Sequence, residues 1–126
     1  MRVVDTSAWI AWLLGGNLGK SLASEMPSKE RWLVPTIVQY ELTLWSLRES
    51  SEAVANRAIA FSMECVIAPL DSRLALRAVE VAQQNGLAMA DAIIYTTAIE
   101  AGADLLTCDA HFDGLASVAY FARGAE

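Results

Sequence analysis

Apolar and polar positions along the chain follow two alternating periods. Short runs rich in Val, Leu and Ile suit buried strands, whereas longer stretches with apolar residues three or four apart suit helices. Strand-like runs separated by helical stretches are typical of a parallel sheet covered by helices. The pattern predicts four or five strands: Arg2–Asp5, Trp32–Val34, Cys65–Ala68, Asp104–Thr107 and, at the edge of the sheet, Val118–Phe121.

Helical periodicity and capping residues place six helices between these strands. Asp71 is an expected N-cap, Ser50-Ser51 opens another helix, and Thr36 with Gln39 three residues later has the spacing of a capping box. No repeat or low-complexity stretch interrupts the pattern, so we expect a single α/β domain over residues 1–126. Caps included, the expected helices cover residues 7–14, 18–26, 36–48, 50–63, 71–84 and 90–101.

Composition and charge narrow the class of protein. The chain is 55% apolar and 19% charged, which is the composition of a folded domain with one core. Nine basic residues against fifteen acidic ones give a formal net charge of −6, which argues against capture of nucleic acid by a general basic surface. No stretch reaches the ~18 consecutive apolar residues that span a bilayer, and Asp5 falls where a signal peptide needs its apolar centre. These features predict a cytoplasmic protein without membrane contact.

Cysteine and histidine are scarce. Cys65, Cys108 and the single histidine, His111, are too few for a disulfide framework or a four-ligand zinc site. Both cysteines are interpreted as small buried hydrophobes. Cys108 and His111 lie three residues apart, but a nucleophilic pair also needs an orienting group and an oxyanion site. The favoured interpretation of His111 is a loop histidine that packs beside Phe112.

Four carboxylates occupy positions where the local pattern calls for apolar side chains. Asp5 and Asp109 follow the first and fourth strands, and ligands of an open parallel sheet bind beyond the carboxyl ends of its strands. Glu41 borders the apolar face of its helix. Asp91 lies within an apolar stripe and in the first turn of its helix, where the helix dipole favours a negative charge. Together the four residues predict one acidic site at the edge of the sheet.

Carboxylates that converge repel one another and need cations. Basic side chains are one source, but the candidates fall mainly on the polar sides of their helices: Arg48, Arg57, Arg73 and Arg77. An oxygen-only ligand set without His or Cys favours Mg²⁺ or Mn²⁺ over zinc or copper. Taken singly, the strand-end acids could be caps and the helix acids could form buried salt bridges. Taken together, they favour a divalent-metal site.

Four segments, taken together, resemble one family of nucleases. They are Asp5-Thr6-Ser7-Ala8, Tyr40-Glu41-Leu42, Ala90-Asp91-Ala92-Ile93-Ile94 and Leu105-Leu106-Thr107-Cys108-Asp109-Ala110-His111-Phe112. In this order and spacing the sequence resembles the PIN-domain ribonucleases, specifically the VapC-type toxins of toxin–antitoxin pairs. The resemblance implies a three-layer α/β/α sandwich with a parallel sheet.

The same resemblance implies an activity and its partners. The expected activity is a metal-dependent endoribonuclease that uses Mg²⁺, for which Mn²⁺ can substitute, and leaves 5′-phosphate and 3′-hydroxyl ends. Its catalytic and metal-binding acids map to Asp5, Glu41, Asp91 and Asp109. A cognate antitoxin that wraps the toxin and a toxin homodimer are also implied. Cys108 stands where many relatives carry Arg, which removes one phosphate contact and leaves the acids in place.

Further side chains are candidates for supporting roles. Ser7 and Thr107 could orient a carboxylate or a water on the metal, although an ordinary turn or strand-end hydrogen bond explains them equally well. Asp113 is a weaker fifth acid, better interpreted as a surface residue. The candidates for RNA contact, each also interpretable as a solvated surface charge, are Lys20, Lys29, Arg31, Arg48 and Arg123.

The mean hydropathy of +0.35 suggests more apolar surface than one small core can bury. Large exposed apolar patches usually mark partner sites. Part of one aromatic and leucine set is therefore expected to line an antitoxin groove, with core packing as the alternative for the rest. The set comprises Trp9, Trp12, Trp32, Leu44 and Trp45.

Three other functional classes compete with this interpretation. A phosphoacceptor receiver domain needs an acidic pair after the first strand and a Lys near the fifth, whereas the chain has Asp5 alone and no Lys beyond Lys29. A haloacid-dehalogenase-type phosphatase needs a second Asp where Ser7 stands. The serious rival is a catalytically silent PIN-like module that binds RNA or a protein, because metal ligands indicate capacity and not turnover.

Overall fold

Five parallel strands form the sheet, in the order β3-β2-β1-β4-β5. The structure is a computed structural model that describes residues 1–124. The fifth strand that the sequence allowed is present, and the predicted boundaries of β4 are confirmed. The strands are β1 (Arg2–Val4), β2 (Trp32–Pro35), β3 (Val66–Ala68), β4 (Asp104–Thr107) and β5 (Val118–Tyr120).

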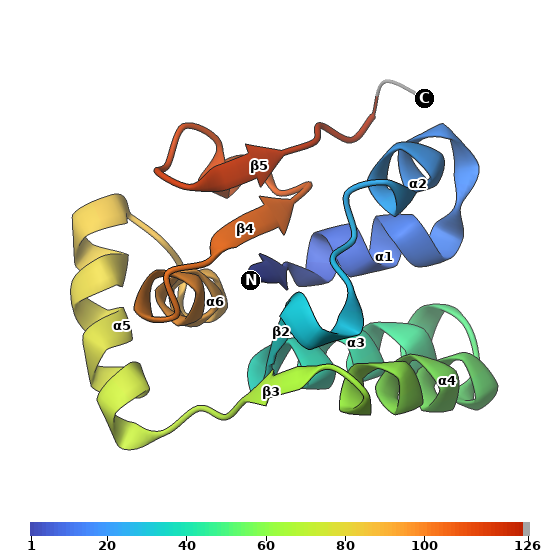
Figure 1. Cartoon of the computed structure of the whole chain (residues 1–126), viewed down its shortest axis with the longest axis horizontal. Coiled ribbons are helices and arrows are strands. Elements are labelled where there is room, and N and C mark those ends of the chain that lie inside the picture. The colour runs from blue at the N-terminus through green and yellow to red at the C-terminus, as the bar shows by residue number, and fades with distance from the viewer. Residues whose placement is uncertain (125–126) are drawn as a thin grey trace.

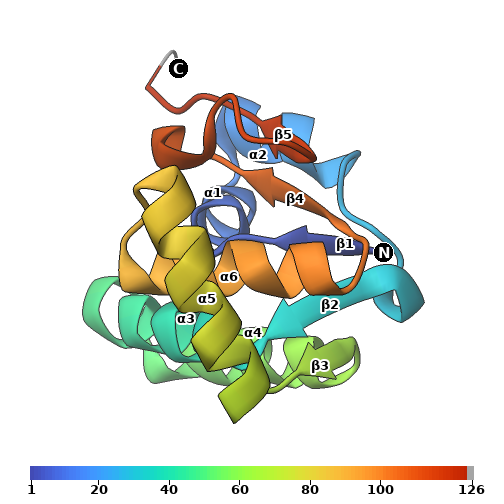
Figure 2. The same cartoon turned by 90° about the vertical axis from the view of Figure 1, so that its left-hand side faces the viewer.

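Six helices cover the two faces of the sheet. In Figure 1, α5 and α6 lie to the left of the strands, and α1 to α4 lie to the right. In Figure 2, α6 lies in front of the sheet and runs alongside β1 with α5 outside it, while α1 and α2 lie behind. The predicted α/β/α sandwich is therefore confirmed. The helices are α1 (Thr6–Leu14), α2 (Gly16–Ala23), α3 (Thr36–Glu49), α4 (Glu52–Met63), α5 (Ser72–Asn85) and α6 (Met89–Glu100), with short 3₁₀ turns η1 (Lys29–Arg31) and η2 (Ala110–Phe112).

The strand order places a topological switch point between β1 and β4. The chain moves outward from β1 through β2 to β3, then crosses by α5 and α6 to β4 on the other side of β1. Val4 pairs in register with Leu106, and the N–H of Asp5 donates to the carbonyl of Leu106 at 2.9 Å. The carboxyl ends of the two central strands therefore lie side by side, where open α/β sheets bind ligands.

The core explains why the central strands read as continuous apolar runs. Val3 and Val4 of β1, and Leu105 and Leu106 of β4, have no exposed surface because helices cover both faces of the sheet. A cluster of four aromatic rings packs beside β2, with ring centroids 4.7–5.9 Å apart. The aromatic cluster comprises Trp9, Trp12, Trp32 and Phe61.

Two of the predicted helix caps are confirmed and one is wrong. Ser51 and Asp71 each accept a backbone N–H in the first turn of α4 and α5. Thr36 does not cap α3, because Pro35 occupies the N-cap position and Thr36 is the first helical residue. The Thr36 hydroxyl instead accepts the N–H of Leu70 at 3.2 Å. The Thr36 hydroxyl thus makes a tertiary contact with the segment before α5 in place of the predicted cap at the start of α3.

None of the helices in the described part of the chain combines the length and the apolar character that crossing a membrane requires.

Candidate metal centre

The carboxyl ends of β1 and β4 bring two of the predicted acids together. Asp5 directly follows β1, and Asp109 lies two residues beyond β4. Helix α6 packs on both strands and contributes Asp91 from its first turn. The sequence thus folds so that three separate elements deliver a carboxylate to one edge of the sheet.

The Asp5 carboxylate is held by two hydroxyl groups. Asp5 is 3% exposed, and its Oδ2 accepts hydrogen bonds from Ser7 Oγ at 2.6 Å and from Thr107 Oγ1 at 2.8 Å. The two hydroxyl oxygens in turn accept the backbone N–H of Cys108 and of Asp109, each at 3.0 Å. Each hydroxyl has one hydrogen, so both hydrogens are used on Asp5 although the two oxygens approach to 3.2 Å. The network therefore fixes Asp5 as a hydrogen-bond acceptor.

Helix capping does not explain Asp5. It occupies the N-cap position of α1, but its side chain makes no capping hydrogen bond. Burial raises the pKa of Asp5 to about 6, against the opposing effect of the Ser7 and Thr107 hydrogen bonds. The negative charges of Asp91 and Asp109 raise it further. Asp5 is thus a buried acid whose pKa is raised by both neighbouring carboxylates.

Asp91, Asp109 and His111 form a compact group of potential metal ligands. His111 Nδ1 lies 3.3 Å from Asp91 Oδ2 and 3.3 Å from Asp109 Oδ1. One ligand atom from each residue lies within 4.8 Å of the other two. Burial raises the pKa of Asp91, and the nearby Asp109 raises it further, while His111 acts in the opposite direction. We refer to these three residues as the Asp–Asp–His cluster.

The interpretation of His111 as a histidine packed beside Phe112 is wrong. Phe112 has no exposed surface, whereas the His111 side chain is 74% exposed and turns Nδ1 toward the acids. Asp109 causes this placement, because its Oδ1 accepts the N–H of His111 at 2.9 Å and caps η2. An aspartate two residues before a histidine is a local signal of such a turn.

Glu41 and Asp113 lie outside the Asp–Asp–His cluster. Glu41, half-buried on α3, accepts a hydrogen bond from Thr6 Oγ1 at 2.7 Å, which places it beside the residue that follows Asp5. Asp113 is exposed. The structure therefore brings Asp91 and Asp109 into one cluster, places Asp5 where their charges raise its pKa, holds Glu41 on α3 next to Thr6, and leaves Asp113 at the surface.

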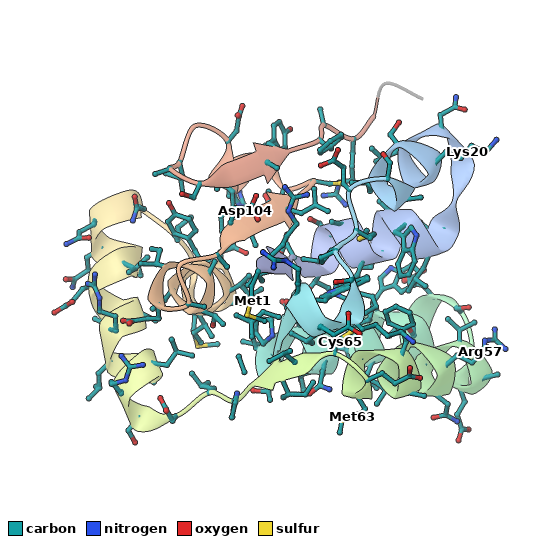
Figure 3. All side chains as sticks on the ribbon, in the orientation of Figure 1. Met1, Lys20, Arg57, Met63, Cys65 and Asp104 are labelled. Carbon is teal, nitrogen blue, oxygen red and sulfur yellow. The ribbon has the colours of Figure 1, made fainter. Side chains whose placement is uncertain are left out.

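Apart from His111, no basic side chain of the described chain pairs with these acids. Within residues 1–124, neither Lys nor Arg forms an ion pair with the four predicted ligands. Arg73 and Arg77 both pair with Glu100 instead, and Arg57 lies on α4, away from the sheet (Figure 3). Repelling carboxylates without a Lys or Arg fit a divalent cation. The donor set contains nitrogen as well as oxygen, however, so the premise of an oxygen-only site does not hold.

Cys108 has no role as a nucleophile. Its side chain is 3% exposed, and burial raises the pKa of its thiol to about 11. A thiol of this kind stays protonated and unreactive at neutral pH. Its contribution to the site is the backbone N–H that it donates to Ser7.

The predicted antitoxin groove divides between core and surface. Trp32, 2% exposed, belongs to the aromatic cluster and offers no groove surface, which is the core packing expected for part of the set. Trp9, 1% exposed, borders a pocket of about 250 Å³ together with the half-buried Trp12. Leu44 lines a groove of about 690 Å³ between α3 and α4, and Trp45 on the same helix is half-buried.

One of the proposed RNA-contacting cations is already engaged. Lys29 pairs with Glu64 and lies 4.9 Å from the centre of the Phe61 ring. Arg123 shares with Ser7 the lining of a cavity of about 140 Å³, next to the Asp5 network. Lys20 lies at the outer edge of α2 (Figure 3). In the described chain, no ion pair forms at Lys20, Arg31, Arg48 or Arg123.

Comparison with known proteins identifies one family. A sequence model described as the PIN domain matches residues 2–118. Comparison with curated protein sequences finds no significant match.

Solved structures with the same fold include several toxins. A chain of a toxin–antitoxin complex from Klebsiella pneumoniae is 22% identical with a TM-score of 0.80, over 94% of this chain and 96% of that one. VapC20 of Mycobacterium tuberculosis, described as a sarcin–ricin loop cleaving toxin, is 23% identical with a TM-score of 0.74, over 94% and 97%. A chain of VapBC2 from Rickettsia felis, bound to a promoter DNA fragment, is 15% identical with a TM-score of 0.72, over 95% and 98%. At these identities the likeness establishes the fold.

Proposed function

We propose that this chain, which belongs to the PIN domain family, is a metal-dependent endoribonuclease toxin that a cognate antitoxin neutralises. The observation that carries the proposal is the group of carboxylates without a Lys or Arg partner at the switch point between β1 and β4, in the described chain. The structural likeness to a toxin–antitoxin complex and to a toxin that cleaves RNA supports it. Action on cellular RNA would place the protein in the cytoplasm.

The residues of the site have separable roles in this proposal. Asp5, Asp91 and Asp109 would hold a divalent cation, with Glu41 approaching from α3, beside Thr6. Ser7 and Thr107 both bind Oδ2 of Asp5, so Oδ1 forms no hydrogen bond in the described structure and is available as a ligand. The cation would supply charge stabilisation at a phosphodiester and lower the pKa of a water that attacks phosphorus in line.

Substrate binding must rely on few basic groups, because the chain carries a net charge of −6. Arg123 is the best placed of them, since it borders the cavity that also contains Ser7. It could contact an RNA phosphate next to the acids, where Cys108 offers no positive charge. Cation binding at the acids would add the remaining attraction for the RNA backbone.

Exposed apolar surface supports the proposed protein partners. The groove between α3 and α4 presents Tyr40, Leu47 and Met63, each more than half exposed. A second apolar groove, of about 520 Å³, lies between α5 and α6 and includes the exposed Met89. Apolar patches of this kind are typical of protein–protein contacts. They support cover by an antitoxin and by a second copy of the chain.

RNA cleavage with purified protein tests the proposal. Defined RNAs are incubated with Mg²⁺, with Mn²⁺ or with a chelator, and the wild type is compared with Asp5→Asn and Asp91→Asn. We expect cleavage only with metal, and a loss of at least about 100-fold in both variants. Asp113→Asn, which removes a nearby exposed acid, serves as the matched control and should cleave at the wild-type rate. Wild-type rates in Asp5→Asn and Asp91→Asn would contradict the proposal.

The alternative is a catalytically silent PIN-like module that binds RNA or a protein. The same assay separates the two, because a binding module would shift the RNA in a gel and leave it intact.

A further inference from the structure

We propose that His111 is itself a ligand of the metal, through Nδ1, and that this imidazole makes the site favour Mn²⁺ over Mg²⁺. The inference rests on the metal site of the proposed function and deepens it by naming a ligand and the preferred ion. His111 supplies nitrogen to a site that is otherwise built from carboxylate oxygens.

The spacing of the ligand atoms supports a shared ion. His111 Nδ1 lies at the same distance, 3.3 Å, from Asp91 Oδ2 and from Asp109 Oδ1. Atoms bound to one ion through bonds of about 2.0–2.2 Å lie roughly 3 Å apart. The imidazole nitrogen is thus already where a ligand shared with both aspartates would be.

The backbone fixes this position even though the His111 side chain is 74% exposed. Asp109 accepts the N–H of His111 through Oδ1, the same atom that faces the ring nitrogen. Phe112, the next residue, has no exposed surface and anchors the turn in the core. Asp109 therefore supplies one ligand and also positions the next ligand, His111, which lies two residues further along the chain.

The chemistry of the donors decides between the ions. Mg²⁺ prefers oxygen ligands and gives up its waters reluctantly, whereas imidazole binds first-row transition ions, for which affinity rises from Mn²⁺ onward. Replacing one oxygen or water by an imidazole nitrogen strengthens binding of Mn²⁺ more than binding of Mg²⁺. The alternative role for His111 is a protonated counter-charge between Asp91 and Asp109, which would leave as the cation binds.

The experiment uses the fact that His111 is the only histidine in the sequence. In untagged protein with bound Mn²⁺, pulsed electron paramagnetic resonance detects an imidazole ¹⁴N coupled to the metal, and that signal can come from no other residue. Protein labelled with ¹⁵N-histidine should replace the ¹⁴N pattern by a ¹⁵N one. Titration of free Mn²⁺, with Mg²⁺ as competitor, gives the two affinities.

We expect the nitrogen coupling in the wild type and its loss in His111→Gln. The Mn²⁺ affinity should fall about 10- to 100-fold in that variant, and the Mg²⁺ affinity by less than about threefold. Asp113→Asn, a substitution in the same loop, should keep the coupling and both affinities. Because the His111 side chain is largely exposed, His111→Gln should stay folded, which its circular dichroism spectrum checks.

Bound Mn²⁺ without a nitrogen coupling would overturn the inference and identify His111 as a counter-charge only. Equal losses of Mn²⁺ and Mg²⁺ affinity in His111→Gln would overturn the ion preference. Neither readout involves RNA, so a wild type that shows the coupling but never cleaves RNA would contradict the proposed function and leave the inference standing.

Discussion

The two central strands, β1 and β4, carry charged residues at both ends. At the amino ends these residues form ion pairs with each other, whereas at the carboxyl ends they lack a Lys or Arg partner in the described chain. At the amino ends, Arg2 of β1 donates to both carboxylate oxygens of Asp104 on β4, at 2.9 and 2.8 Å, and to Glu25 at 3.0 Å. Asp104 is the first residue of β4 and pairs in register with Arg2. At the carboxyl ends, Asp5 and Asp109 meet Asp91 without a Lys or Arg partner in the described chain.

The charged residues at the amino ends of β1 and β4 therefore have a structural role, and those at the carboxyl ends form the candidate metal site. The amino-end charges are satisfied within the chain, so they contribute to stability and need nothing else. The carboxyl-end charges repel one another, so they lower stability until a cation binds. Active sites commonly reduce stability in this way, because groups that must act on a ligand cannot be fully satisfied without it.

The largest effect on stability is expected from Asp5→Asn in chelated protein. The raised pKa of Asp5 favours the protonated form in the folded state, so its contribution to stability is present below pH 3.8 and is lost as pH rises through about 6. At pH 7.5 the variant should be more stable than the wild type by about 2–3 kcal/mol, and near pH 4 the two should agree. Urea unfolding at both pH values measures this. A less stable variant at pH 7.5 would show that ionised Asp5 is satisfied.

Arg2→Gln tests the other end of the strands. It leaves Asp104 and Glu25 without their cation, and we expect a loss of about 2 kcal/mol in the free energy of unfolding, lessened by the partial exposure of both carboxylates. Mn²⁺ affinity should not change, because the residue lies at the opposite end of β1. A loss of metal binding that matches the loss of stability would break the distinction between the two ends.

Thr107→Val probes the hydroxyl network with a smaller change. The variant removes one of the two hydrogen bonds to Asp5 and leaves the N–H of Asp109 without its acceptor. We expect a loss of about 1 kcal/mol in stability and a severalfold loss in cleavage. Thr107→Ser restores the hydroxyl and should recover most of the cleavage rate. If Thr107→Val cleaves normally, the orientation of Asp5 does not depend on this hydroxyl.

Among substitutions of the four predicted metal ligands, Glu41→Gln should have the smallest effect on metal binding. Glu41 lies outside the Asp–Asp–His cluster, and its Oε1 is engaged by Thr6. The Mn²⁺ affinity should change by less than about threefold, whereas Asp91→Asn should reduce it by at least about tenfold. Calorimetric titration of both variants gives the comparison. Equal losses would place Glu41 among the principal ligands.

Much of the fold was predictable because its strongest signals are local. The central strands are buried on both faces, so Val3-Val4 and Leu105-Leu106 read as apolar runs without ambiguity. The cap at Thr36 was wrong because the partner of its hydroxyl, Leu70, is 34 residues away. No local pattern contains that contact.

The site was partly predictable for a related reason. Asp5, Asp91 and Asp109 interrupt apolar patterns, and such interruptions are visible in a sequence. His111 interrupts nothing, and its position depends on a turn set by Asp109, so it was missed. Among the tryptophans, burial depends on which layers pack over them, so no local pattern showed that Trp9 and Trp32 lie in the core.

The central claim is that the carboxyl-end acids lower stability until a divalent cation binds, and one measurement tests it most directly. The free energy of unfolding of untagged protein is measured at pH 7.5 with chelator and with Mn²⁺ at about 100 times its Kd, for the wild type, for Arg2→Gln and for the triple variant Asp5→Asn, Asp91→Asn, Asp109→Asn. We predict a gain of about 2.7 kcal/mol on Mn²⁺ addition for the wild type and for Arg2→Gln, and none for the triple variant. A wild type that gains nothing from Mn²⁺, or a triple variant that gains as much, would contradict the account.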